Sequence, residues 1–267
     1  MRTFVERKKT AFLHAHAVQL LLWMWYPADY NEAVKLQIIP EYAILKRQRQ
    51  TLFRTALPHQ DGVRQMPGYT ADTIGYYEKN AEKFIRDTAS ADMRSVREAF
   101  LAYIPEGGRI LDLGCGSGRD SRAFLDAGYR VTSLDGSPAL CRAAQLLTGQ
   151  EVICSLFQEY RPEGLYDGIW ACASLLHLSG EDLLYTVRKY AGALRSGGCF
   201  YMSFKKGDFS GERNGRFFTD LTKESLSDLL SQVNDLKTDS LFLTGDVRPG
   251  RGSEEWINVF AIKEEKE

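Results

Sequence analysis

The sequence predicts an α/β fold: a doubly wound, mostly parallel seven-stranded sheet that follows a helical N-terminal extension. From residue 71 onward, short apolar runs typical of buried strands alternate with stretches of helical periodicity. A glycine-rich turn follows the first apolar run, as in sheets that bind nucleotide-type ligands at their carboxyl edge. Only a short, glycine-rich link separates the last two runs, so we expect them to form an antiparallel hairpin.

The expected elements follow each other in the order of a doubly wound sheet. Strands are predicted at residues 109–113, 130–134, 151–155, 166–172, 199–204, 237–243 and 255–262. Helices are predicted at residues 72–89, 91–103, 121–127, 139–147, 181–194 and 223–233. The link at residues 244–253 contains Gly245, Pro249, Gly250 and Gly252, which favour a turn. The sheet is therefore expected to end in a mixed edge.

The chain of 267 residues is longer than one Rossmann-like domain requires, and its charge is unevenly distributed. Residues 1–70 contain ten lysines and arginines but only five aspartates and glutamates, although the net charge of the whole chain is −1. Prolines and glycines gather between Pro58 and Gly68, as is typical of a linker. We therefore place a boundary near residue 70, between a basic, helical extension of unknown role and a domain at residues 71–267.

Composition excludes several classes of protein. With 44% hydrophobic and 26% charged residues, the chain is neither disordered nor membrane-spanning. Its small net charge provides no global field that attracts nucleic acid. The cysteines include no Cys-x-x-Cys pair, which argues against a disulfide framework and a zinc site and fits a reducing, cytoplasmic compartment. His14 and His16 have no further ligands nearby in the sequence, so no bound metal is expected.

The segment after the first expected strand contains the main ligand-binding signal. Asp112 precedes a Gly-x-Gly-x-Gly turn made by Gly114, Gly116 and Gly118. The dinucleotide fingerprint requires a glycine three residues after Gly116, where this chain has Arg119. The turn therefore suits a ligand with an amino-acid tail, whose ammonium group Asp112 can bind directly or through water.

Asp135 lies at the end of the second expected strand, at the same edge of the sheet. A carboxylate at this place can accept hydrogen bonds from both hydroxyls of a ribose. The strand, the glycine turn and this aspartate together predict a ligand that contains a nucleoside as well as an amino-acid tail.

Over residues 72–264 the sequence resembles the class I S-adenosylmethionine-dependent methyltransferases, which have a Rossmann-like fold. Within this class it is most similar to the small-molecule, tellurite-methyltransferase-like branch. The resemblance implies that the chain binds S-adenosylmethionine and moves its methyl group to a small polar acceptor by in-line displacement. It rests on residues 112–118, 135, 166–170 and 194–198 for the class and on residues 118–120 and 173–177 for the branch.

The resemblance also assigns roles to individual residues. Gly114, Gly116 and Gly118 are expected beside the methionine portion of the cofactor. Many relatives have an acidic residue at the position of Leu156, so adenine recognition here is expected to rest on backbone groups and Phe157. The expected cofactor-binding residues are Asp112, Gly114, Cys115, Gly116, Gly118, Asp135, Gly136, Leu156, Phe157, Ala173, Ser174 and Tyr77.

His177 is the candidate catalytic residue, because it is the titratable group expected nearest the point of methyl transfer. One interpretation makes it a general base that accepts the acceptor's proton near neutral pH. The other makes it a histidine that shapes the site without titrating. The sequence leaves both open.

Residues 205–220 are expected to overhang the carboxyl edge as a mobile, glycine-rich loop at which the acceptor enters. The forked guanidinium groups of Arg213 and Arg216 suit an oxyanion of the acceptor. A solvated loop without a role is the alternative, in which case Phe217 and Phe218 become the candidates for contact. We therefore expect a small acceptor that is anionic or strongly polar rather than a lipid.

Two other functions stay open at this stage. One is an RNA-modifying methyltransferase that uses the basic residues 1–70 to bind nucleic acid. The other is a regulatory protein that binds the cofactor without turnover. A membrane location is not expected, because the apolar stretch at residues 11–26 is short and interrupted by polar residues.

Overall fold

The computed structural model describes residues 67–248 and 250–264. Almost all of the expected N-terminal extension, and with it the proposed nucleic-acid module, lies outside the described residues. The boundary near residue 70 stays a prediction. None of the described helices is long and apolar enough to cross a bilayer.

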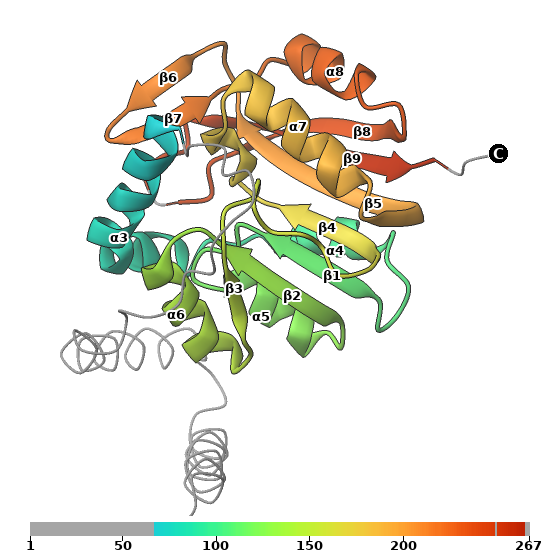
Figure 1. Ribbon diagram of the computed structural model, residues 1–267, viewed down its shortest axis with the longest axis horizontal. Helices are drawn as coiled ribbons and strands as arrows, with labels where there is room; N and C mark the ends of the chain where they lie inside the picture. The colour runs from blue at the N-terminus through green and yellow to red at the C-terminus, as the bar shows by residue number, and fades with distance from the viewer. Residues whose placement is uncertain (1–66, 249, 265–267) are drawn as a thin grey trace, which may run out of the picture. The chain divides into compact units, whose positions relative to one another are not determined.

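A seven-stranded sheet forms the centre of the structure, with the strand order β3-β2-β1-β4-β5-β9-β8 (Figure 1). Neighbouring strands from β3 to β5 run parallel, whereas β9 is antiparallel to both β5 and β8. This arrangement confirms the predicted fold, including the antiparallel hairpin at one edge. The strands are β1 (Arg109–Leu113), β2 (Arg130–Asp135), β3 (Val152–Cys154), β4 (Tyr166–Ala171), β5 (Leu194–Lys205), β8 (Leu236–Gly245) and β9 (Glu255–Lys263).

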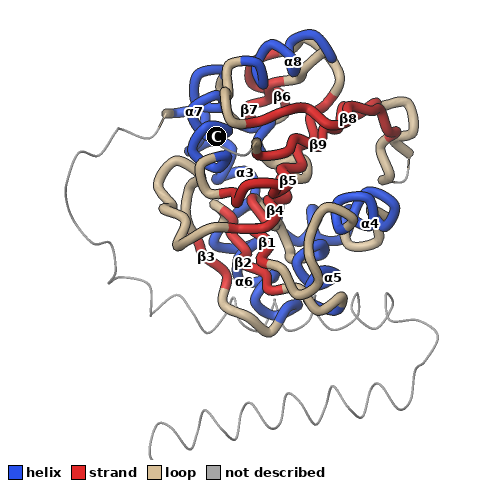
Figure 2. Tube along the Cα trace, turned by 90° about the vertical axis from the view of Figure 1, so that its right-hand side faces the viewer, coloured by secondary structure: helices blue, strands red, loops and turns tan. Residues whose placement is uncertain are grey.

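Helices cover both faces of this sheet, with α4 and α5 on one side and α7 on the other (Figure 2). Successive residues of β4 show why this strand has a continuous apolar sequence: Ile169 and Ala171 pack in one core cluster, and Trp170 packs in another. All three side chains are fully buried. The helices are α3 (Gly68–Thr88), α4 (Arg94–Leu101), α5 (Arg119–Asp126), α6 (Pro138–Thr148), α7 (Gly180–Ala191) and α8 (Lys223–Ser231), with a short 3-10 helix η1 (Leu175–His177) after β4.

A buried ionic network joins α4, α5 and β4 beneath the glycine turn. Asp120 accepts hydrogen bonds from Arg97 (2.7 Å), from Arg119 (2.7 Å) and from the indole nitrogen of Trp170 (3.1 Å). Burial alone raises the pKa of Asp120, but the two arginines outweigh it and hold that pKa below its usual value. The sequence Gly118-Arg119-Asp120 therefore fixes the start of α5 against the sheet.

The segment between β5 and α8 differs from the expected mobile loop. It forms a two-stranded hairpin, β6 (Ser210–Arg213) and β7 (Arg216–Thr219). Asn214 and Gly215 at its tip both have positive φ, 55° and 73°, as a tight two-residue hairpin turn requires. The hairpin lies beside α3, where the hydroxyl of Thr73 accepts a hydrogen bond from the Phe217 backbone at 3.0 Å (Figure 1). Residues 210–219 thus form a regular hairpin instead of the expected mobile loop.

Candidate functional site

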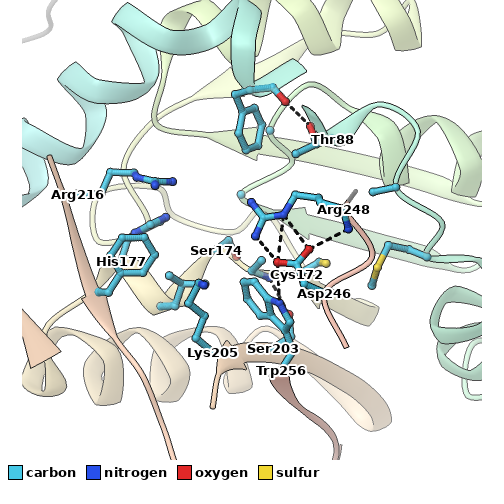
Figure 3. Close-up of a pocket in the computed structure, with 18 of the residues that line it drawn as sticks. Thr88, Cys172, Ser174, His177, Ser203, Lys205, Arg216, Asp246, Arg248 and Trp256 are labelled. Atoms are coloured by element: carbon cyan, nitrogen blue, oxygen red, sulfur yellow. Dashed lines mark hydrogen bonds and ion pairs between the residues drawn. The ribbon is translucent and has the colours of Figure 1, made fainter. Parts of the chain in front are cut away.

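A cavity of about 850 Å³ lies at the carboxyl edge of the sheet. In the sheet, β2 lies on one side of β1 and β4 lies on the other side. The loops that follow β1 and β4 therefore lead away in opposite directions, which leaves a crevice between the carboxyl ends of these two strands. The glycine turn, α3, the loop after β4, the β6–β7 hairpin and the β8–β9 loop all contribute to its lining (Figure 3). A volume of this size is typical of a small-molecule site.

The glycine turn gives the cavity its backbone wall. Gly114 has φ +86°, and a Cβ at this position would lie 2.3 Å from Cβ of Ser174. Gly116 has φ +57°, and a Cβ there would lie 3.2 Å from the ring of Phe84. Only glycine combines this backbone conformation with such close neighbours, so these positions require glycine for the turn to pack against Ser174 and Phe84 while its backbone lines the cavity.

Asp135 lies directly beside this turn. Its two carboxylate oxygens accept hydrogen bonds from the backbone of Gly116 at 2.9 Å and of Ser137 at 2.8 Å. Burial raises the pKa of Asp135 to about 6, although these backbone groups favour its charged form. Each oxygen can accept more than one hydrogen bond, so Asp135 remains able to receive ligand hydroxyls.

Asp112 lies deeper, at the end of β1. Its carboxylate accepts a hydrogen bond from the hydroxyl of Ser121 at 2.6 Å, and it is 2% exposed. Burial, followed by the nearby charge of Asp120, raises the pKa of Asp112 to about 7. Asp112 still lines the cavity, so it can present a carboxylate there at and above neutral pH.

The loop after β3 lines another part of the cavity with Ser155, Leu156, Phe157 and Gln158. The side-chain nitrogen of Gln158 is buried and has no hydrogen-bond partner among the described residues. A buried donor without a partner is costly and indicates a place for an acceptor atom of a ligand. Sequence reasoning missed Gln158, because it lies one residue beyond the pair that the family pattern singles out.

The end of β4 is strained where it borders the cavity. Ala173 has φ 52°, which is unusual for a residue other than glycine, and its backbone donates a hydrogen bond to the hydroxyl of Ser203 at 2.8 Å. The hydroxyl of Ser174 donates to the carbonyl of Leu113 at 2.6 Å. Both bonds hold the backbone after β4 against β1 and β5, and strain of this kind is found at functional sites.

His177 contacts Tyr77 across the cavity wall. Nδ1 lies 2.6 Å from the carbonyl oxygen of Phe217, which can only accept, so the ring proton is on Nδ1. The other ring nitrogen, Nε2, then accepts the hydroxyl proton of Tyr77 at 2.9 Å. Burial lowers the pKa of His177 to about 4, which leaves the ring neutral at physiological pH. This geometry favours the interpretation in which His177 shapes the site rather than the interpretation as a general base.

Comparisons with known proteins agree with this geometry. Residues 110–198 match the methyltransferase domain family. A ubiquinone biosynthesis O-methyltransferase of Xanthomonas campestris is 31% identical over 107 residues, which are 36% of this chain and 43% of the relative. A trans-aconitate 2-methyltransferase of Klebsiella pneumoniae is 39% identical over 80 residues, which are 28% of this chain and 31% of the relative. The match thus spans less than half the length of these curated relatives.

The fold is also similar to solved structures. The 1,6-didemethyltoxoflavin-N1-methyltransferase of Burkholderia thailandensis, solved with S-adenosylhomocysteine, superposes with a TM-score of 0.61 at 21% identity. This match covers 78% of this chain and 94% of that one. A TehB-like methyltransferase of Corynebacterium glutamicum matches with a TM-score of 0.52 at 20% identity, covering 71% of this chain and 100% of that one. Residues 110–198 therefore match a methyltransferase domain, within the Rossmann-like fold that this chain shares with these solved methyltransferases.

Most of the residues predicted for the site of this methyltransferase domain line its cavity. Gly118 is the exception. It lies at the start of α5 with a positive φ of 88°. A Cβ added to Gly118 would lie 3.0 Å from the α carbon of Ala144 in α6, so this glycine packs against the protein. Gly118 therefore contributes to the shape of the turn without lining the cavity. The predicted residues found in the cavity lining are Tyr77, Asp112, Gly114, Cys115, Gly116, Asp135, Gly136, Leu156, Phe157, Ala173, Ser174 and His177.

The β8–β9 loop is a wall of the methyltransferase domain that sequence reasoning missed. Asp246 accepts hydrogen bonds from Arg248 and from the indole nitrogen of Trp256, and all three residues line the cavity (Figure 3). The hydrogen bonds from the guanidinium lower the pKa of Asp246 to about 2, although burial opposes them. In the sequence this segment is a glycine-rich link between two strands. Such a pattern predicts a turn, but it does not predict that the turn lines the cavity.

Proposed function

We propose that the protein is an S-adenosylmethionine-dependent methyltransferase that acts on a small polar acceptor. One observation carries this proposal: a single cavity joins the glycine turn and Asp135 to a second, polar half formed by α3, the hairpin and the β8–β9 loop. A cofactor in the first half therefore borders directly on space for an acceptor. Transfer between two bound molecules needs such a shared site.

The residues of the first half fit this cofactor. Gly114 and Gly116 line this half with backbone that no Cβ covers, and the carboxylate of Asp135 lies beside it for the ribose hydroxyls. The buried nitrogen of Gln158 offers a donor to a ring nitrogen of adenine. Asp112 offers a carboxylate for the ammonium group.

When bound, S-adenosylmethionine supplies a sulfonium methyl group that a nucleophile can displace. The chain's own contribution is to align the acceptor and to exclude water, which requires no covalent intermediate with the protein. Tyr77 and Phe84 of α3 pack edge to face at 5.2 Å over this part of the cavity. They cover the site where water would otherwise enter.

The volume of the whole cavity, about 850 Å³ for both halves, supports a small acceptor. The relatives named above act on trans-aconitate and on 1,6-didemethyltoxoflavin according to their names, and both are small molecules. The alternative, an RNA substrate, depends on the basic residues 1–70, almost all of which lie outside the described residues. The cavity volume of about 850 Å³ favours the small molecule.

A transfer assay tests this proposal against both alternatives. The purified protein is incubated with methyl-labelled S-adenosylmethionine and a cell extract, with and without ribonuclease, and the labelled products are identified by mass spectrometry. We expect a labelled small molecule whose yield ribonuclease does not change. Label in RNA supports the RNA-modifying alternative, and cofactor binding without any labelled product supports the regulatory one.

A further inference from the structure

The cations that line the cavity are neutralised with one exception. Arg216, on β7, forms no ion pair with a carboxylate among the described residues, although it lines the cavity. The other lining cations each form an ion pair with an aspartate or glutamate: Arg119, Lys205, Lys206, Arg213, Arg248 and Arg251. The charge of Arg216 is therefore available to a ligand.

The two arginines of the hairpin consequently differ. The guanidinium of Arg213 donates to both carboxylate oxygens of Asp220, at 2.8 and 3.0 Å. Both guanidinium groups lie against aromatic rings, but Arg216, 4.3 Å from the ring centre of Tyr76 and 5.0 Å from that of Phe218, has no carboxylate partner among the described residues. Such rings hold a guanidinium in position without neutralising it.

Neutral hydrogen bonds fix one side of this guanidinium. Nη1 of Arg216 lies 3.5 Å from the Tyr77 hydroxyl oxygen, which is a long contact. That hydroxyl gives its proton to His177, and His177 in turn donates to the carbonyl of Phe217. Because Tyr77 donates its hydroxyl proton to His177, its oxygen remains free to accept a hydrogen bond from Arg216. His177 stays neutral and adds no competing charge.

The opposite edge of the guanidinium has a vacant donor. Nε of Arg216 is buried and has no hydrogen-bond partner among the described residues. Nε and Nη2 together form the side-on edge of arginine, which binds a carboxylate or phosphate through two parallel hydrogen bonds. Figure 3 shows the Arg216 side chain extending into the cavity beside His177. A buried, charged donor without a partner is unfavourable, so this edge suits an anionic ligand group.

Building on the function proposed above, we propose that the methyl acceptor carries an oxyanion, a carboxylate or a phosphate-type group, and that Arg216 binds it. The acceptor's nucleophile then lies within the same cavity as the cofactor half. Arg213 takes no part, because Asp220 occupies it. Tyr77 and His177 are positioning residues that orient Arg216.

Calorimetry on the complex with S-adenosylhomocysteine tests this proposal without a known acceptor. The probes are inorganic phosphate, malonate and citrate, with malonamide as the neutral counterpart of malonate. We expect at least one oxyanion to bind in the millimolar range or tighter and malonamide not to bind. A preference for phosphate over malonate and citrate identifies a phosphate-type acceptor, and the reverse identifies a carboxylate.

Substitutions then assign the binding to Arg216. Arg216→Ala should weaken the oxyanion by at least about tenfold, the value of a lost charged hydrogen-bond pair. Arg216→Lys, which keeps the charge but not the fork, should weaken it less. Arg86→Ala, which removes an exposed arginine of α3, is the matched control and should bind like the wild type. All these variants should keep their affinity for S-adenosylhomocysteine within about twofold, since a change of this size corresponds to less free energy than one hydrogen bond contributes.

Three results overturn the inference. The first is equal oxyanion affinity in the wild type and Arg216→Ala, and the second is no oxyanion binding by a wild type that does bind S-adenosylhomocysteine. The third is loss of S-adenosylhomocysteine affinity in Arg216→Ala while Arg216→Lys retains it, which assigns the guanidinium to the cofactor. A wild type that does not bind S-adenosylhomocysteine at all contradicts the proposed function itself and is thereby distinguished from these.

Discussion

The two halves of the cavity are built in different ways. The half proposed for the cofactor is organised around one backbone turn, because Gly114 and Gly116 form part of its wall and backbone N–H groups orient Asp135. The acceptor half consists of side chains from separate segments: Tyr77 meets His177 across 100 residues and Arg216 across 139. A binding site that is organised around one turn has a short sequence motif. A half assembled from distant side chains can change its specificity without disturbing that motif.

The largest effect on stability and on ligand affinity is expected from a substitution in the cofactor half. Gly114→Ala adds a Cβ that would lie 2.3 Å from Ser174 at a positive φ. We expect it to lower the free energy of unfolding by about 3 kcal/mol or more, the sum of a steric clash and a left-handed backbone. Binding of S-adenosylhomocysteine should fall by roughly two orders of magnitude, equivalent to nearly 3 kcal/mol. Urea unfolding and calorimetry measure the two effects.

Gly128→Ala is the control, because Gly128 has φ +87° but nothing within 4 Å of the added Cβ. It should cost only the backbone strain, about 1 to 2 kcal/mol of stability, and leave ligand affinity unchanged. Equal losses in both variants would mean that the close approach to Ser174 has no importance.

The cofactor half should also respond to pH. The pKa of Asp135 is raised to about 6 by burial, so its carboxylate is protonated as the pH falls below that value. Because ribose hydroxyls need the charged form, affinity for S-adenosylhomocysteine should decrease below pH 6, by up to about tenfold per pH unit. The carboxyl of Asp112, with its pKa near 7, should add a step close to neutrality that Asp112→Asn removes. Affinity that is constant from pH 5 to 8 is the contrary result.

A smaller effect is expected where the acceptor half joins α3. Thr73→Val removes the hydroxyl that accepts from the Phe217 backbone and leaves that N–H without its partner. The free energy of unfolding should fall by about 1 to 2 kcal/mol, while affinity for S-adenosylhomocysteine stays unchanged. Thr238→Val, at an exposed position of β8, is the control for the substitution itself. A parallel loss of cofactor affinity would show that the two halves are not independent.

The smallest effect on the cofactor half should come from removing the N-terminal segment. Because α3 begins at Gly68 and Tyr69 packs on Phe217 at 4.5 Å, a chain that starts at Pro67 keeps these contacts. We expect it to fold and to bind S-adenosylhomocysteine within about twofold of the full chain, less than the contribution of one hydrogen bond. An insoluble or non-binding product places the domain boundary earlier in the sequence.

The same contrast decides how much could be predicted from the sequence. The order of strands, the glycine turn and the place of Asp135 follow from local patterns, and the structure brings these residues together as expected. The hairpin could also have been predicted, because Asn214-Gly215 is the pair that a tight hairpin turn favours. The glycines nearby favour the prediction of a mobile loop instead.

Other features had no local signal. Arg213 and Arg216 are equivalent in the sequence, and only the contact of Arg213 with Asp220 separates their roles. The neutral state of His177 depends on its burial, and its tautomer depends on Phe217 and Tyr77, which lie 40 and 100 residues away. Pairings of this kind are set by tertiary packing, which a pattern of residue types does not encode.

Titration of the full-length protein with S-adenosylhomocysteine, next to NAD and the Asp135→Ala variant, tests the central claim most directly. We predict micromolar binding of S-adenosylhomocysteine, no binding of NAD, and an affinity at least ~1.5 kcal/mol weaker in Asp135→Ala, the value of hydrogen bonds to a charged group. Asp228→Ala, which removes an exposed carboxylate of α8, should bind like the wild type. Unchanged affinity in Asp135→Ala, or binding of NAD in place of S-adenosylhomocysteine, would contradict the account.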